Sequence, residues 1–60
     1  MQTYCKLKTG EVMVVWSDNT AEGTYDLMPV GYDPEVDVCT TVSHEDVLVV
    51  DTNLWVVGAA

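Results

Sequence analysis

Arginine is absent from this 60-residue sequence, and lysine occurs only twice, against ten Asp and Glu residues. The formal net charge of −8 repels the phosphates of nucleic acids and the headgroups of anionic lipids, so we expect no direct binding to either. A basic protein is an expected partner, including one whose own ligand is nucleic acid. The alternative is that the charge only keeps a small protein in solution.

Long apolar runs are also absent. The N-terminal residues lack the apolar core of a secretory signal, and no run approaches the roughly 20 residues needed to span a bilayer. The expected compartment is therefore cytoplasmic, where Cys5 and Cys39 stay free thiols. Two Cys and one His fall short of the four ligands of a structural zinc site, and we predict no metal and no cofactor.

Isoleucine and phenylalanine are missing too, while Val occurs twelve times and Thr seven times. β-Branched residues pack well on a pleated sheet and lose rotamer freedom in a helix, so this composition predicts strands almost throughout. The chain has the length of one domain, spanning 1–60, and a chain this short buries only about 60% of its unfolded surface. We therefore expect a single all-β domain of marginal stability.

Turn-forming residues divide the chain into short segments of strand composition. The predicted strands cover residues 2–7, 11–16, 24–30, 36–42, 47–50 and 54–57. Residues 36–42 alternate between apolar and polar side chains, which is typical of a half-buried strand. Ser43 is expected to cap one 3₁₀ turn before the strand at 47–50, and the last strand is its hairpin partner.

Short strands with a turn about every 8–12 residues indicate a small barrel rather than a sandwich of about 100 residues. A closed barrel also removes exposed strand edges. The order and spacing of the elements over about fifty residues resemble an SH3-like barrel, which implies about five to six short antiparallel strands with one 3₁₀ turn. The Ala-Leu-Tyr-Asp-Tyr pattern of signalling SH3 domains is absent, so the resemblance implies no ligand and no binding residues.

Three carboxylates, on Asp33, Glu35 and Asp37, are spaced by two and would project to one side of an extended segment. Such a row can bind Ca²⁺, but the Gly and the bidentate Glu that complete an EF-hand loop are missing at the required positions. The other interpretations are a solvated acidic face and a row that meets Lys or Arg on a partner. Tyr32 precedes the row, and an aromatic ring beside carboxylates suits a basic partner through cation–π contact.

A second acidic pair, Glu45 and Asp46, lies beside the only His on the predicted 3₁₀ turn. The run Ser-His-Glu at 43–45 is not a catalytic triad, because triads are assembled from separate elements. Asp18 and Glu22, in a predicted polar loop, extend the acidic surface. The two Trp residues lie at the ends of apolar strands, so we predict that both are buried in the core.

These observations predict a small acidic protein-binding module that docks a negative surface into a basic groove of another protein. Inhibitors encoded by phages or mobile elements share this size and charge, and a negative surface can mimic nucleic acid. The alternative is a structural subunit of a virion or larger complex, joined through its apolar C-terminal hairpin; a homo-oligomer is also open. An enzyme ranks last, because so small a chain has little room for a ligand cavity. The residues predicted to contact the partner are Tyr32, Asp33, Glu35, Asp37, Glu45, Asp46, Asp18 and Glu22.

Overall fold

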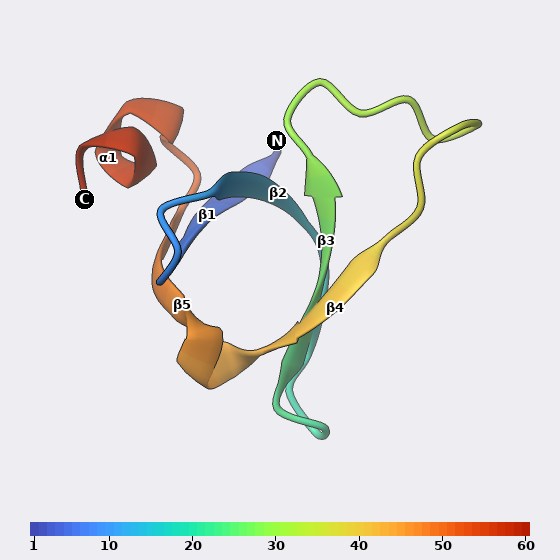
Figure 1. Ribbon diagram of the computed structural model, residues 1–60, viewed down its shortest axis with the longest axis horizontal. Helices are drawn as coiled ribbons and strands as arrows, with labels where there is room; N and C mark the ends of the chain where they lie inside the picture. Colours follow the sequence, from blue (N-terminus) through green and yellow to red (C-terminus); the bar gives the residue numbers. More distant parts are fainter.

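The computed structural model describes all residues from 1 to 60 and is mostly β-structure (Figure 1). Its elements, in chain order, are β1 (Thr3–Leu7), β2 (Val12–Asn19), β3 (Thr24–Pro29), β4 (Thr40–Ser43), the 3₁₀ turn η1 (His44–Asp46), β5 (Val47–Asp51) and α1 (Leu54–Ala59). The prediction of a β-rich fold with one 3₁₀ turn is confirmed. No helix of the structure is long and apolar enough to cross a bilayer.

All five strands belong to one antiparallel sheet with the order β4-β3-β2-β1-β5. The sheet curls until its two edge strands approach each other at η1, the short turn that joins them (Figure 1). β4 and β5 are not paired with each other, so the sheet is curled but not closed. β4 and β5 therefore each have one side that is not paired with another strand.

The hairpins follow from local turn chemistry. Gly10 has a φ of 94° and Gly23 a φ of 70°, a left-handed conformation that glycine adopts at no steric cost, and each glycine lies in the turn of a hairpin. β2 continues to Asn19, beyond the predicted strand end, because its ladder with β3 reaches the pair Asn19–Thr24. A bulge between Val15 and Ser17 bends β2 on the way.

The C-terminal segment is a helix, so the prediction of a strand and a hairpin at 54–57 is wrong. The Asn53 side chain accepts a hydrogen bond from the amide of Trp55 at 2.9 Å, which caps the first turn of α1. At the other end, the Lys6 ammonium donates to the backbone oxygens of Ala60 at 2.7 Å and Gly58 at 3.5 Å. A cation at this end also complements the helix dipole. α1 lies on the outside of the curled sheet (Figure 1).

The second wrong prediction concerns residues 36–39, which precede β4 and are not paired with the sheet. β3 ends at Pro29, which has no amide hydrogen, and the chain turns away at Gly31 with a φ of 78°. Ser43 also differs from expectation, since its side chain does not cap η1.

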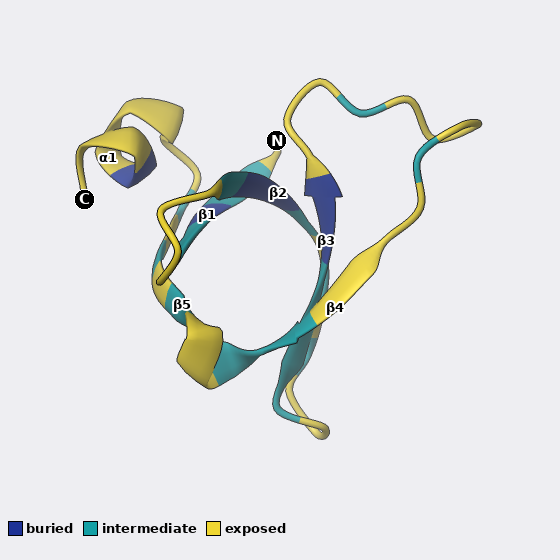
Figure 2. Cartoon of the chain, viewed as in Figure 1, coloured by how far each residue is buried: buried dark blue, intermediate teal, exposed yellow.

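The concave side of the sheet carries the core. Cys5, Met13 and Leu27 are buried there, against a rim of half-buried residues (Figure 2). That rim consists of Leu7, Val15, Tyr25, Val42 and Val47. Cys5 faces inward and Cys39 is exposed, and both are free thiols, as predicted. Because only six of the sixty residues are buried, many apolar side chains remain at the surface.

Candidate functional site

The eight residues predicted to contact a partner fall into two groups. The first group lies in the long loop between β3 and β4, and the second lies around the β2–β3 turn and η1. These positions flank opposite ends of β3, which spans about 20 Å at roughly 3.3 Å per residue. The sheet therefore does not bring all eight into one patch. The first group is Tyr32, Asp33, Glu35 and Asp37, and the second is Asp18, Glu22, Glu45 and Asp46.

The carboxylates of the first group do not form the extended row that their spacing suggests. The amides of Val36 and Asp37 both donate to the Asp33 carbonyl, at 3.0 and 2.8 Å, which closes a turn. The Asp37 carboxylate accepts from the Asp33 amide at 2.9 Å, and the Asp33 carboxylate accepts from the Glu35 amide at 3.0 Å. Two of the three carboxylates thus fix the loop backbone. No group of three or more His, Cys, Asp or Glu side chains in the structure is placed to hold a metal ion.

An aromatic pair anchors this loop to the sheet. The rings of Trp16 on β2 and Tyr32 meet edge to face, with centroids 5.5 Å apart and an angle of 87° between planes. Trp16 is 52% exposed, so the prediction that it is buried is wrong. Tyr32, expected at the surface, is half-buried by this contact. No sequence pattern indicates this pairing, because the two residues lie on separate elements.

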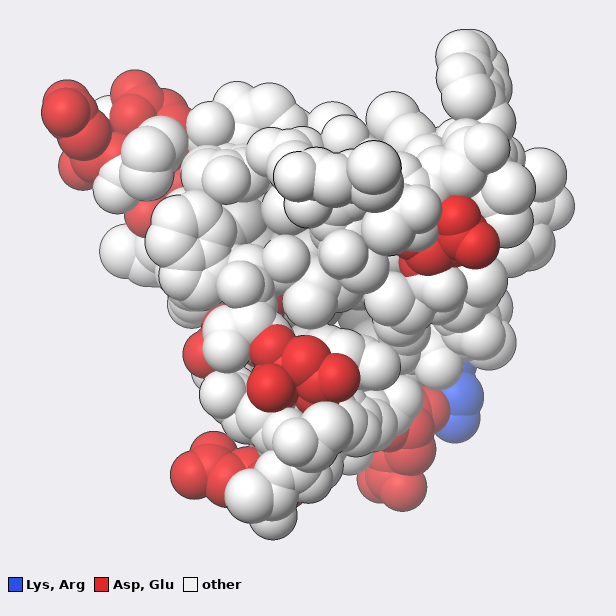
Figure 3. Space-filling view, turned by 180° about the vertical axis from the view of Figure 1, so that it is seen from behind, with Lys and Arg blue, Asp and Glu red and all other residues white.

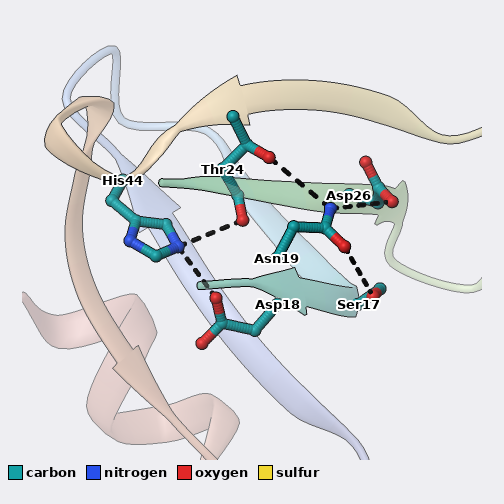
Figure 4. A network of polar contacts seen from close by, with 6 residues as sticks. All are labelled: Ser17, Asp18, Asn19, Thr24, Asp26 and His44. Atoms are coloured by element: carbon teal, nitrogen blue, oxygen red, sulfur yellow. Dashed lines mark hydrogen bonds and ion pairs between the residues drawn. The ribbon is translucent and has the colours of Figure 1, made fainter. Parts of the chain in front are cut away.

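Within the second group, Asp18 is held by His44 (Figure 4). The Nε2 atom of His44 lies 2.8 Å from a carboxylate oxygen of Asp18 and 3.0 Å from the Thr24 carbonyl. Because both neighbours are acceptors, Nε2 carries the hydrogen. The imidazole also packs on the Tyr25 ring, with centroids 4.2 Å apart. Burial, followed by the nearby Asp18 charge, raises the pKa of Tyr25. His44 thereby ties η1 to β2 and β3.

Asp26, which is not among the residues predicted to contact a partner, connects three strands. Its carboxylate accepts from the Thr41 hydroxyl on β4 at 2.8 Å and from the Asn19 amide on β2 at 3.2 Å. These hydrogen bonds, that from Thr41 first, lower the pKa of Asp26. The Asn19 side chain also reaches Thr24 and Ser17 (Figure 4). The sequence does contain one indication of this role: Asp is depleted in strands, so an Asp within a predicted strand marks a position where a polar contact is expected.

Most carboxylates of the molecule have no cationic partner within the chain. Asp18 is the only carboxylate within ion-pair distance of a cationic or imidazole side chain, and the other nine of the ten have no such partner. Lys6 is engaged with the end of α1 instead. On the face shown in Figure 3, the carboxylates lie in several groups separated by uncharged surface. No cavity opens in the structure.

A separate apolar surface belongs to α1. Trp55 is 87% exposed, contrary to its predicted burial, and Leu54 and Val56 are exposed beside it. Val57 is the one buried residue of the helix. No charged side chain occurs from residue 52 to 60, so this surface differs in chemistry from both acidic groups.

Comparison with known proteins reveals no relatives: no family model, no curated protein and no solved structure matches the chain.

Proposed function

We propose that this protein is a small binding module that docks a negative surface into a basic groove of another protein, without catalysis. The observation that carries the proposal is that nine of ten carboxylates have no cationic partner within the chain. Their field is therefore available to a partner rather than neutralised internally. Complementary charge of this kind speeds association and sets register more than it adds affinity.

The curled sheet supplies the scaffold, and we propose that it works as a partly open barrel of the SH3-like kind. The strand order β4-β3-β2-β1-β5, with the 3₁₀ turn η1 before the last strand, supports this assignment. The two acidic groups extend from opposite ends of β3, so a partner groove that meets both must be at least about 20 Å long. A groove that otherwise holds nucleic acid has suitable length and sign of charge.

The same chemistry suggests how the protein acts. A groove lined with Lys and Arg binds phosphates, and a stiff array of carboxylates competes for it. We propose an inhibitor of this type, encoded by a phage or another mobile element, that acts in the cytoplasm, where two free thiols are stable.

The test is capture of proteins from a host extract on the immobilised protein at about 50 mM and about 500 mM salt, where screening lengths differ severalfold. We expect the captured basic protein to be lost at high salt. The double variant Glu35→Gln, Asp37→Asn should weaken capture, whereas the matched variant Glu11→Gln, Asp51→Asn removes the same charge outside both groups and should weaken it less. Capture that is indifferent to salt, or equal loss in both variants, contradicts the proposal.

A second candidate function is assembly into a larger complex through α1. The exposed Trp55 and its apolar neighbours favour it, although the predicted apolar hairpin is a helix. Sedimentation over a range of concentrations distinguishes this function, because self-assembly of a chain with a charge of −8 strengthens as salt screens repulsion. Docking into a basic groove has the opposite salt dependence. Trp55→Ser should abolish assembly and leave docking unchanged.

A further inference from the structure

The segment 36–39 has the sequence of a strand without a strand partner. Val36 is 76% exposed and Val38 is 81% exposed, although alternating apolar residues are typical of a side chain row that faces a core. The amides of Val38 and Cys39 donate no hydrogen bond within the chain. The segment runs directly into β4 at Thr40. An unpaired extension of a strand is therefore present at this edge.

β4 itself has a free side. It pairs with β3 on one side only, because it is the first strand of the sheet order (Figure 1). The His44 amide donates to the Gly23 carbonyl across the β3 side. Hydrogen-bonding direction alternates along an antiparallel strand, so the backbone groups of Thr41 and Ser43 are directed away from β3. Cys39 continues the same phase, which makes a row of available amides and carbonyls along 39–43.

We propose that this edge, residues 38–43, accepts an extended strand of the partner by β-augmentation; this inference rests on the proposed function. Main-chain hydrogen bonds to the free edge would give affinity, and the exposed Val38 would contact an apolar side chain of the partner strand. On binding, β4 would lengthen from its present start at Thr40 back to Val38, while Val36 and Asp37 stay in the turn on the Asp33 carbonyl.

The charges at this edge select the occupant. A second copy paired antiparallel along this edge would place the acidic turn of one copy beside Glu45 and Asp46 of the other, and a parallel copy would place the two acidic turns together. Either arrangement opposes like charges, which is destabilising. A strand that alternates Lys or Arg with apolar residues instead places cations near the acidic groups at the two ends of this edge. The partner segment is therefore a basic, alternating strand.

The test uses a synthetic peptide of alternating Lys and Val residues, and amide hydrogen exchange of the full chain followed by NMR. We expect the amides of Cys39, Thr41 and Ser43 to exchange at least tenfold more slowly with the peptide, while those of α1 do not change. The matched control is a peptide of the same sequence that is N-methylated at every Lys and Val, which keeps the charge and removes the strand donors of both edges. The variant Cys39→Pro, which lacks one outward amide, should also lose the protection at Thr41.

The outcomes separate the two proposals. The β-augmentation inference is overturned, and charge-based docking survives, if the peptide binds in a salt-dependent way but leaves the amides of Cys39, Thr41 and Ser43 unprotected. The same conclusion follows if the N-methylated peptide protects these amides equally. If neither peptide binds at about 50 mM salt, the β-augmentation inference is overturned, and the salt dependence of capture decides the docking proposal separately. Unchanged exchange of the β1–β2 amides in the Cys39→Pro variant shows that the sheet still folds.

Discussion

Replacement of Leu27 by Ala tests where the stability of this fold resides. Leu27 is fully buried on β3, at the centre of the concave core. A buried Leu→Ala change costs about 2–5 kcal/mol, from lost transfer energy and the cavity left behind. A 60-residue chain has a total stability of about 3–9 kcal/mol at roughly 0.05–0.15 kcal/mol per residue. The substitution should therefore remove about half of the free energy of unfolding or more.

The assay is urea denaturation followed by far-UV circular dichroism, because both Trp residues are exposed in the folded state and report weakly on folding. With a urea slope of about 1 kcal/mol per M for a small protein, a loss of about 3 kcal/mol moves the midpoint by about 3 M. Leu48→Ala is the matched control, since Leu48 lies on β5 and is exposed, and it should cost less than about 1 kcal/mol. Equal shifts in the two variants would refute the assignment of the core.

Three further predictions follow from polar groups. Lys6→Met removes the ammonium that binds the last backbone oxygens of α1. Hydrogen exchange of the α1 amides should therefore accelerate while the sheet amides stay protected, and the free energy of unfolding should fall by about 0.3–1 kcal/mol. Hydrogen bonds from the Thr41 hydroxyl and the Asn19 side chain amide lower the pKa of Asp26. The ionised carboxylate therefore stabilises the fold above about pH 4, and this contribution is lost as the pH falls through the lowered pKa. Thermal midpoints measured from about pH 5 to pH 2 should therefore fall less steeply for Asp26→Asn. Burial raises the pKa of the Cys5 thiol, so a thiol reagent should modify Cys39 alone in the native protein and both cysteines in urea.

The sequence pattern was reliable where side chain alternation and turn residues agreed. The first three strands, the turn at Gly10 and the 3₁₀ turn before β5 were all predicted near their observed positions. The burial of Cys5 on β1 also followed from side chain phase, whereas Cys39 is exposed as predicted but lies outside any strand. In these regions, local preference and tertiary pairing favour the same structure.

The predictions of secondary structure and burial were wrong where contacts between distant segments, rather than local sequence preference, determine the structure. An apolar run of four residues fits a strand and a buried helix equally, and at α1 the Asn53 cap and the Lys6 contact select the helix. Residues 36–39 have strand preference but no strand beside them. Both Trp residues are exposed, and a chain this short encloses little space: its concave core holds only Cys5, Met13 and Leu27 as buried residues.

The candidate site was predictable only as a set of acidic residues. Their division into two groups depends on the direction of β3, which a residue list does not contain. The roles of Asp26 and Trp16 depend on contacts across β2, β3, β4 and the long loop.

The engagement of Lys6 with α1 leaves Lys8, in the turn between β1 and β2, as the only side chain amine free for coupling chemistry. This turn and the β3–β4 loop lie on opposite sides of the molecule in Figure 1. A biosensor chip that captures the protein through this amine therefore orients the β3–β4 loop toward the flowing analyte.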